Sequence, residues 1–441
     1  MPKTKRPRIS VFTPSHDTRF LEDAYKSLLS QTFEDWEWIV VLNGPAIDED
    51  LEDIFYDSRV TILDASDETA MSKNVGALKR ECVEYCSGDI LVELDHDDML
   101  AEECLQYVSD AFKVNPNASL VYTDWAQINE DGTPNDERWN EAHGWVYRDV
   151  LVTVDGVTNI YLSPHAMPPL PTNVALIWYA PNHVRAFSRT AYDKVDGYDA
   201  NRNVMDDGDL MTRLYQVGPF VHIPDCLYLQ RVGLTGTVNT QKDPKLNEQI
   251  QADTLAVYNA QMEGLMTAWC LQNDLDMIYL DQSQMGEWPS IFETITKPSS
   301  VGFIMAPGVL QYLSPHEVVP FMAEAYRVLA HGGMLMAITP STDGRLAFMR
   351  FDYLSYWNEN TFWQFVNPQW SSPDIAVNQK WQLTRSFTYS ADQFGEVQQL
   401  LLVRADLVAI KDGGCVAGVN LWKQLVHENP TGAKSVGTVL E

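Results

Sequence analysis

Short apolar runs and amphipathic segments alternate along the first hundred positions of the chain. The apolar runs have the length of buried strands and occupy residues 8–14, 35–44, 60–65 and 88–95. The segments between them, 18–33 and 72–86, carry apolar residues at helical spacing, for example Leu21, Ala24, Tyr25, Leu28 and Leu29. Strands that alternate with helices predict an α/β fold with a mainly parallel sheet, covered on both faces. Ligands of such sheets lie beyond the carboxyl ends of the strands.

The pattern changes twice further along the chain. Residues 125–180 are rich in Pro, Asn and Trp, which predicts long loops that shape a pocket or an insertion on the surface. Helical spacing returns at Leu210, Leu214 and Val217, and residues 236–255 read as a polar connector that runs into a helix. New apolar segments follow, so we predict two α/β domains, residues 1–255 and 256–441.

Composition narrows the classes of protein that the chain can be. A net charge of −30 argues against broad adhesion to nucleic acid or anionic lipid, which needs a basic face. The six cysteines include no C-x-x-C pair, which predicts reduced thiols in the cytoplasm. No apolar run reaches the roughly 18–20 residues of a membrane span, and the first residues are too polar for a secretory signal. We therefore expect a cytoplasmic protein without a membrane partner.

The stretch "ILVELDHDDML" at 90–100 ends an apolar run in three carboxylates, Asp95, Asp97 and Asp98. On an extended chain residues i and i+2 point the same way, so Asp95 and Asp97 share a side and His96 faces away. Mg²⁺ and Mn²⁺ take one or two protein carboxylates together with phosphate and water. The pattern fits a divalent cation that neutralises a leaving diphosphate. A solvated surface turn explains the same residues.

A second acidic group, "DDGDL" at 206–210, precedes the helical pattern of 210–217. An acceptor hydroxyl that attacks an anomeric carbon must lose its proton, and a nearby carboxylate serves as general base. Crowded acids raise one another's pKa toward a usable value, which suits Asp207 beside Asp206 and Asp209. Taken alone, the group is better explained by a helix N-terminus, which favours acids through its dipole and its capping needs. Its place after the D-H-D-D motif favours the general base.

Three stretches in order, 9–44, 71–100 and 195–218, resemble family 2 glycosyltransferases of the GT-A fold, and the resemblance covers roughly residues 8–255. It implies a nucleotide-sugar donor, with a UDP-sugar favoured, and Mn²⁺ or Mg²⁺ as cofactor. Transfer of a hexosyl or pentosyl group by in-line attack implies inversion at the anomeric carbon.

The resemblance also implies contacts to the donor. Thr13 and Pro14 end the first strand where the family's backbone cradles the nucleotide base. Lys73 and Asn74 match a basic residue and an Asn that lie near the nucleotide.

The acidic residues take the central roles that the resemblance implies. Asp95 contacts the ribose or a metal-bound water, Asp97 ligates the metal with it, and Asp98 orients the turn. Asp206 and Asp207 match the family's acidic pair, in which the second member is the catalytic base.

Two positions depart from the family pattern. Asn43 stands where the family usually carries an Asp for the base or ribose, which puts base preference in doubt. Arg231 matches a basic position near the diphosphate, but Gly233 and Leu234 occupy the place where a His often follows it. Metal affinity is weakened, or the site is completed by water and diphosphate.

Residues 301–345 resemble the carboxyl-terminal half of class I S-adenosylmethionine methyltransferases, with "RVLAHGG" at 327–333 in place of the family's "RVLKPGG". No G-x-G lies upstream to seat the cofactor, and Asp281 is the one candidate for its ribose. The resemblance implies a truncated domain kept as a scaffold, dimer surface or acceptor platform.

The residues leave the acceptor and two rival functions open. Trp178, Tyr179 and His183 are weak candidates for an acceptor platform, with core packing as the alternative. The acceptor is a glycan or protein, or a hydroxymethylated pyrimidine in phage-type DNA, and a homodimer is also left open. A DNA groove would draw on these basic residues: Lys73, Arg185, Arg189 and Arg202. The rival functions are a bifunctional glycosyltransferase–methyltransferase and a non-catalytic sugar-nucleotide-binding protein, in a bacterial or phage-infected cell.

Overall fold

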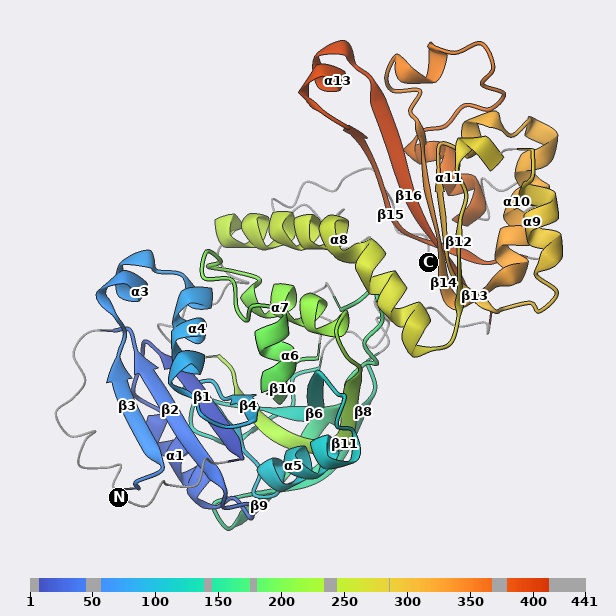
Figure 1. The fold of residues 1–441 in the computed structure, drawn as a ribbon. Coiled ribbons are helices and arrows are strands. Elements are labelled where there is room, and N and C mark those ends of the chain that lie inside the picture. Colours follow the sequence, from blue (N-terminus) through green and yellow to red (C-terminus); the bar gives the residue numbers. More distant parts are fainter. Residues whose placement is uncertain are drawn as a thin grey trace. The chain divides into compact units, whose positions relative to one another are not determined.

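The computed structural model describes residues 8–44, 57–138, 145–174, 181–233, 244–284, 286–366 and 379–411. The chain forms two compact units, Met1–Met262 and Glu263–Glu441, and the division falls within the long helix α8 (Pro244–Gln272). Figure 1 gives the elements of each unit, which are described separately below.

The N-terminal unit is built on a sheet with the strand order β3-β2-β1-β4-β10-β6-β11-β5, and β7 pairs with β6. Strands β3, β2, β1 and β4 run parallel, β11 runs parallel to β6, and β10 and β5 run antiparallel to their neighbours. The mainly parallel α/β sheet predicted from the alternating pattern is confirmed. The strands are β1 (Ile9–Ser15), β2 (Trp36–Leu42), β3 (Val60–Asp64), β4 (Ile90–Glu93), β5 (Met99–Leu100), β6 (Leu120–Ile128), β7 (Pro134–Asn135), β10 (Arg185–Ser188) and β11 (Phe220–Arg231).

Amphipathic helices cover this sheet with their apolar faces. Helix α4 packs on β1 and β2, and α5 packs on β11 and β6. Gly76 in α4 allows a close approach to the turn at 199–202, because a Cβ at Gly76 would lie 2.1 Å from the carbonyl oxygen of Asp199. The helices are α1 (Leu21–Leu29), α3 (Asp67–Ser72), α4 (Val75–Tyr85), α5 (Cys104–Val114), α6 (Arg189–Lys194) and α7 (Asp206–Tyr215).

Part of the region expected to form long loops is regular. Strands β8 (Tyr147–Val154) and β9 (Val157–Pro164) pair as an antiparallel hairpin. Its two-residue turn is Asp155-Gly156, with φ of 48° and 74°. Asp-Gly is the dipeptide that such a turn prefers, since both central residues need positive φ. The expectation of loops was wrong at 147–164 because the aperiodic Pro-rich residues around the hairpin outweighed this signal.

The second unit contains a five-stranded sheet in the order β12-β13-β14-β16-β15. Strands β12 to β14 are parallel, and β16 runs antiparallel to both of its neighbours. The elements are β12 (Asp276–Tyr279), α9 (Trp288–Thr294), β13 (Val301–Pro307), α10 (Pro315–Val328), β14 (Leu329–Pro340), α11 (Glu359–Val366), β15 (Trp381–Ser390), α13 (Gln393–Gln398) and β16 (Leu401–Ala409). The sheet ends at β12 within the described residues, so it lacks the reversal of strand order at which doubly wound sheets bind dinucleotides.

Two further expectations concern the chain as a whole. The described cysteines are all buried and free of disulfides, namely Cys82, Cys86, Cys104, Cys226 and Cys270. Over the described ranges, every helix is too short or too polar to serve as a membrane span.

Candidate active site

The D-H-D-D turn lies between β4 and β5 and is anchored to β11 through Asp98. The Asp98 carboxylate is buried and accepts hydrogen bonds from the Tyr228 hydroxyl (2.8 Å) and the main-chain N–H of Arg231 (2.7 Å). The Arg231 side chain in turn donates from Nε to the main-chain oxygen of Asp97 (2.8 Å). This anchoring fixes the turn at the carboxyl end of β4, where parallel sheets bind ligands.

Asp95 and Asp97 are half-buried, whereas His96 is buried and packs edge-to-face on His16 with ring centroids 4.8 Å apart. Burial, followed by the charge of Glu93, raises the pKa of Asp95 to about 6. In the described part of the chain, no hydrogen bond or ion pair reaches the carboxylate of Asp97. The structure therefore leaves that carboxylate available to a ligand.

Asp95, Asp98 and His183 form what we call the strand-end group. Their potential metal-ligating atoms all lie within 4.8 Å of one another. His183 is 3% exposed, stacks on Tyr228 with ring centroids 4.3 Å apart, and places Nε2 3.8 Å from Oδ2 of Asp95. Its Nδ1 is buried and has no hydrogen-bond partner among the described residues. Burial, followed by the charges of Asp97 and Asp95, raises the pKa of Asp98.

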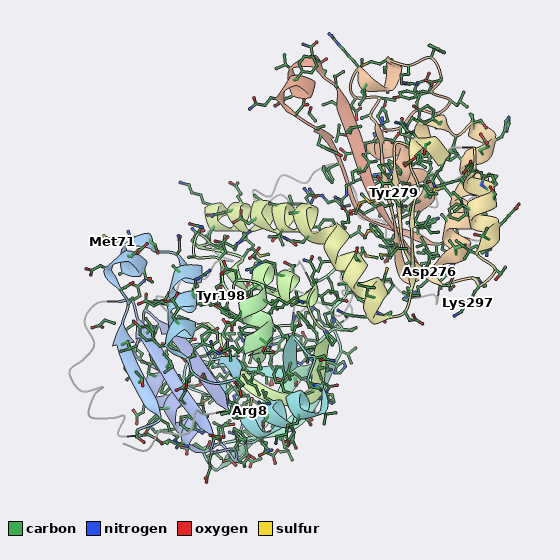
Figure 2. The ribbon with its side chains drawn as sticks, viewed as in Figure 1. Arg8, Met71, Tyr198, Asp276, Tyr279 and Lys297 are labelled. Atoms are coloured by element: carbon green, nitrogen blue, oxygen red, sulfur yellow. The ribbon has the colours of Figure 1, made fainter. Side chains whose placement is uncertain are left out.

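A buried ion network lies next to this group. Lys79 Nζ of α4 lies 2.7 Å from Oε1 of Glu93 and 2.7 Å from Oδ2 of Asp206. Arg185 of β10 reaches Oε2 of Glu93 (3.4 Å), and the hydroxyl of Tyr198, labelled in Figure 2, donates to the same oxygen (3.0 Å). The network joins β4, β10 and the start of α7 in the protein interior.

Burial and pairing oppose each other in the protonation of this network. Burial disfavours the charged form of Glu93, but Lys79 and Arg185 outweigh it and hold the pKa of Glu93 well below its usual value. Burial likewise opposes the charge of Lys79, yet Asp206 and Glu93 raise the pKa of Lys79. For Asp206 burial prevails over Lys79, and the pKa of Asp206 is raised.

Sequence reasoning missed Lys79, Glu93 and Tyr198. The available signal was a charged residue inside an apolar pattern: Glu93 lies within the β4 run, and Lys79 lies on the buried side of α4. Charged side chains are rarely fully buried unless they are paired, so each one indicated an unseen partner.

The acidic start of α7 is held by cations from α4, from β10 and from α7 itself. Besides the Lys79–Asp206 pair, Arg185 lies 2.8 Å from Oδ2 of Asp207, and Arg213 lies 2.6 Å from Oδ2 of Asp209. Each carboxylate faces a cation, and for Asp206 the charge of Asp207 adds to burial in raising the pKa. The N-cap residue of α7 makes no side-chain capping bond, whereas Asp207 in the first turn accepts from the N–H of Gly208 (2.7 Å).

The residues expected around the nucleotide base have structural partners. Thr13 is buried, donates from Oγ1 to the main-chain oxygen of Leu94 (2.7 Å) and accepts from Nε1 of Trp38 (2.8 Å). Pro14 follows it and is half-buried. The main-chain N–H of Asn43 donates to the oxygen of Ser15 (2.7 Å), which leaves the half-buried side chain of Asn43 at the ends of β1 and β2.

The remaining predicted residues lie around the same edge or outside the described chain. Lys73 is exposed with φ of 57°, and Asn74 donates from Nδ2 to the oxygen of Ala200 (3.1 Å). The Arg231 guanidinium pairs with Asp23 at 2.8 Å. Trp178 and Tyr179 lie outside the described residues. Of the residues suggested for an acceptor platform, the structure describes only His183.

The second carboxylate–histidine group, which we call the hairpin group, consists of Asp124, His165 and His222. The fully buried Asp124 accepts from the N–H of Ala166 (2.8 Å) and pairs with Arg148 of β8 (2.8 Å). His222 Nε2 lies 2.8 Å and His165 Nδ1 lies 3.2 Å from its carboxylate. The group ties the β8–β9 hairpin to β6 and β11.

Three of the basic residues suggested for a DNA groove are occupied within the protein. Arg185 is buried in the ion network, Arg189 donates to the main-chain oxygens of Gly88 and Cys86, and Arg202 pairs with Asp209. A cavity of about 500 Å³ lined by Arg8 and Asp89 lies at the amino ends of β1 and β4, opposite the D-H-D-D turn. The candidate site is therefore the edge of the N-terminal sheet at the carboxyl ends of β1 and β4, where the acidic D-H-D-D turn lies.

Comparison with known families identifies the class of domain that carries this site. Residues 10–164 match the family model described as "Glycosyl transferase family 2". The matched range includes the D-H-D-D turn and strands β1 to β9, except for the first residue of β1. This stretch of the N-terminal unit is therefore similar to family 2 glycosyltransferases, and its mainly parallel α/β sheet is of the kind that the resemblance implies.

Curated relatives match about a third to a half of the chain. The O-antigen biosynthesis protein RfbC of Myxococcus xanthus is 29% identical over 239 residues, which cover 52% of this chain and 16% of that protein. The chondroitin synthase of Escherichia coli is 23% identical, covering 50% of this chain and 28% of the synthase. The teichuronic acid biosynthesis glycosyltransferase TuaG of Bacillus subtilis, itself named as putative, is 27% identical, covering 33% and 58%. The alignments thus span less than two thirds of each relative.

Solved structures give distant similarities. S. aureus TarS in complex with UDP has 12% identity and a TM-score of 0.39, covering 56% of this chain and 65% of the other. The Pyrobaculum calidifontis mannosyltransferase PcManGT with GDP-Man and Mn²⁺ has 13% identity and a TM-score of 0.36, covering 59% and 69%.

Proposed function

We propose that the N-terminal unit is a metal-dependent, inverting glycosyltransferase that moves a sugar from a nucleotide-sugar donor to an acceptor hydroxyl. The observation that carries the proposal is the D-H-D-D turn inside the family 2 match. Its Asp98 is anchored to β11, while the carboxylate of Asp97 meets no hydrogen bond or ion pair among the described residues.

The residues around the turn fit a divalent cation. Asp95 and Asp97 offer the oxygen ligands that Mn²⁺ and Mg²⁺ prefer, and Nε2 of His183, 3.8 Å from Oδ2 of Asp95, makes no hydrogen bond among the described residues. A cation bound there would supply Lewis-acid neutralisation of the leaving diphosphate. Arg231 lies beside the turn through its bond to Asp97.

Asp207 receives the proton of the acceptor hydroxyl in this proposal. Arg185 and the N–H of Gly208 hold its two carboxylate oxygens in a fixed orientation, at 2.8 and 2.7 Å. A positioned carboxylate that takes a proton in the transition state contributes about 10²–10⁴-fold to the rate. Arg185 also reaches Glu93, which connects this base to the end of β4.

A UDP-sugar and a glycan acceptor are the favoured substrates. The relatives carry the names O-antigen biosynthesis protein, chondroitin synthase and teichuronic acid biosynthesis glycosyltransferase, which all refer to saccharides. A hydroxymethylated pyrimidine in DNA is the weaker alternative, since Arg185, Arg189 and Arg202 are engaged inside the protein.

For the second unit we propose a scaffold, dimer surface or acceptor platform derived from half of a methyltransferase. The sheet ends at β12 over the described residues, and Asp281 after it uses its carboxylate to accept from the N–H of Ser283 (2.7 Å). S-adenosylmethionine at millimolar concentration is expected to give no binding heat, and a measurable heat would favour the bifunctional enzyme.

The function is tested by incubating the full chain with UDP-, GDP- and CMP-sugars and Mn²⁺ and measuring nucleotide release. Oligosaccharide acceptors and hydroxymethylcytosine DNA form two further arms, read by mass shift. We expect release from one nucleotide class and a sugar mass on a saccharide. Donor binding with no release, unchanged in D207N, would favour a non-catalytic sugar-nucleotide-binding protein.

A further inference from the structure

We propose that His183 is a direct nitrogen ligand of the divalent cation, supplied from the segment before β10 instead of from the region after Arg231. The inference rests on the proposed function, because it concerns the metal of that same site. It concerns a residue that the sequence placed among candidates for acceptor binding.

The position of the His183 ring carries the inference. The side chain is 3% exposed, and stacking on Tyr228 at an interplanar angle of 9° fixes the plane of the imidazole. The Tyr228 hydroxyl also donates to Asp98 and accepts from the main-chain N–H of Asp95 (3.1 Å), so the same tyrosine contacts all three members of the strand-end group. The ring is therefore held against the carboxylates by packing, without a hydrogen bond of its own to them.

The separation of the ligand atoms suits a shared ion better than a direct bond. His183 Nε2 lies 3.8 Å from Oδ2 of Asp95, which is too long for a hydrogen bond. Nitrogen and oxygen atoms that each lie about 2.0–2.2 Å from one cation are separated by roughly 3–4 Å. Nε2, the ring nitrogen that faces Asp95, makes no hydrogen bond in the described structure, although polar atoms of a side chain this deeply buried normally find a partner.

His183 also brings a different ligand chemistry to the site. An imidazole nitrogen favours transition metals such as Mn²⁺ over Mg²⁺. A site made of oxygen ligands alone suits Mg²⁺ as well as Mn²⁺. The proposal therefore predicts that the site prefers Mn²⁺ or Co²⁺ over Mg²⁺, beyond what its carboxylates alone would give.

His96 is the rival nitrogen donor and the matched control. It is buried, its Nε2 has no hydrogen-bond partner, and it lies between Asp95 and Asp97 in the chain. Its ring packs on His16, and it is absent from the group of ligating atoms that includes His183. The H183Q and H96Q variants remove one buried imidazole each and separate the two assignments.

The test uses pulsed electron paramagnetic resonance of the full chain with Mn²⁺ and UDP, which detects nitrogen bound directly to manganese. We expect a ¹⁴N modulation in the wild type, its replacement by the ¹⁵N pattern in protein labelled with ¹⁵N-histidine, its loss in H183Q and its retention in H96Q. Titration should show Mn²⁺ binding about tenfold or more weaker in H183Q.

The possible results separate the assignment of His183 from the metal dependence and from the transferase function. A manganese complex with oxygen ligands alone in the wild type overturns the assignment of His183, while the proposed transferase function stands. Loss of the nitrogen signal in H96Q but not in H183Q overturns it as well. Absence of any Mn²⁺ binding would refute the metal dependence itself. Should H183Q fail to fold, the labelled wild type and H96Q still decide whether a histidine other than His96 binds the ion.

Discussion

The strand-end group and the hairpin group contain the same residue types, but they differ in how their polar atoms are satisfied. In the hairpin group, Asp124 receives the N–H of Ala166 and the side chains of Arg148 and His222. In the strand-end group, Nδ1 of His183 has no partner among the described residues, and Asp95 stays 3.8 Å from the ring.

This difference separates a structural cluster from a site. A buried carboxylate with a full set of donors contributes to stability and has little reason to exchange them for an ion. A buried imidazole that lacks a partner costs free energy unless a ligand supplies one. Residue type and spacing alone would have ranked the two groups equally, and their hydrogen bonds distinguish them.

The largest expected effect is on catalysis. D207N should reduce sugar transfer by about 10²–10⁴-fold, because the amide cannot accept the acceptor's proton. The matched control is D124N, which alters the hairpin group and should retain transfer once its folding is verified by circular dichroism. Initial rates of nucleotide release at saturating donor measure both. Equal losses in the two variants would contradict both the catalytic role of Asp207 and the structural role of the hairpin group.

The next effect concerns the ion network that supports the strand-end group. K79M leaves Glu93 and Asp206 buried without their shared cation, so the free energy of unfolding should fall by about 3–5 kcal/mol. Urea unfolding followed by tryptophan fluorescence measures the change. K113M removes the exposed pair with Asp110 and should cost less than about 1 kcal/mol. Similar costs for both lysines would contradict the buried pairing.

A smaller effect is expected when Asp124 of the hairpin group is changed: the protein should lose stability but keep its affinity for Mn²⁺. D124N should lower the free energy of unfolding by about 1–3 kcal/mol, since it removes acceptors from buried donors. Mn²⁺ affinity in the presence of UDP should stay unchanged in D124N and weaken in D97N. Calorimetric titration of both variants measures this, and weaker Mn²⁺ binding in D124N would move the cation to the hairpin group.

The smallest effect is a dependence of stability on pH. Burial raises the pKa of Asp124, but hydrogen bonds from His222 and Ala166 outweigh burial and lower it overall. A lowered pKa in the folded state gives stability that is complete above the unfolded value of about 3.9 and is lost as the pH falls through the folded value. The stability difference between wild type and D124N should therefore shrink as the pH falls below about 4. A difference that grows as the pH falls below about 4 would reverse the assigned shift.

The sequence predicted the elements of the N-terminal unit more fully than the contacts of its site. The strands ending at Ser15, Leu42 and Glu93 could be read from apolar runs, since each is buried over most of its length. The hairpin at 147–164 could have been read from Asp155-Gly156. The pairing of Lys79 with Glu93 and Asp206 could not, because its members come from three separate elements.

The sequence by itself determined the alternation of strands and helices and the positions of the acidic motifs, since both depend on local periodicity and on residue type along the chain. Only the tertiary structure decided that Arg185 faces Asp207, that Asp98 anchors the turn and that His183 meets Asp95. Those contacts join residues about 20 to 130 positions apart. Their energies come from burial and from the partners that burial brings together, which no local pattern encodes.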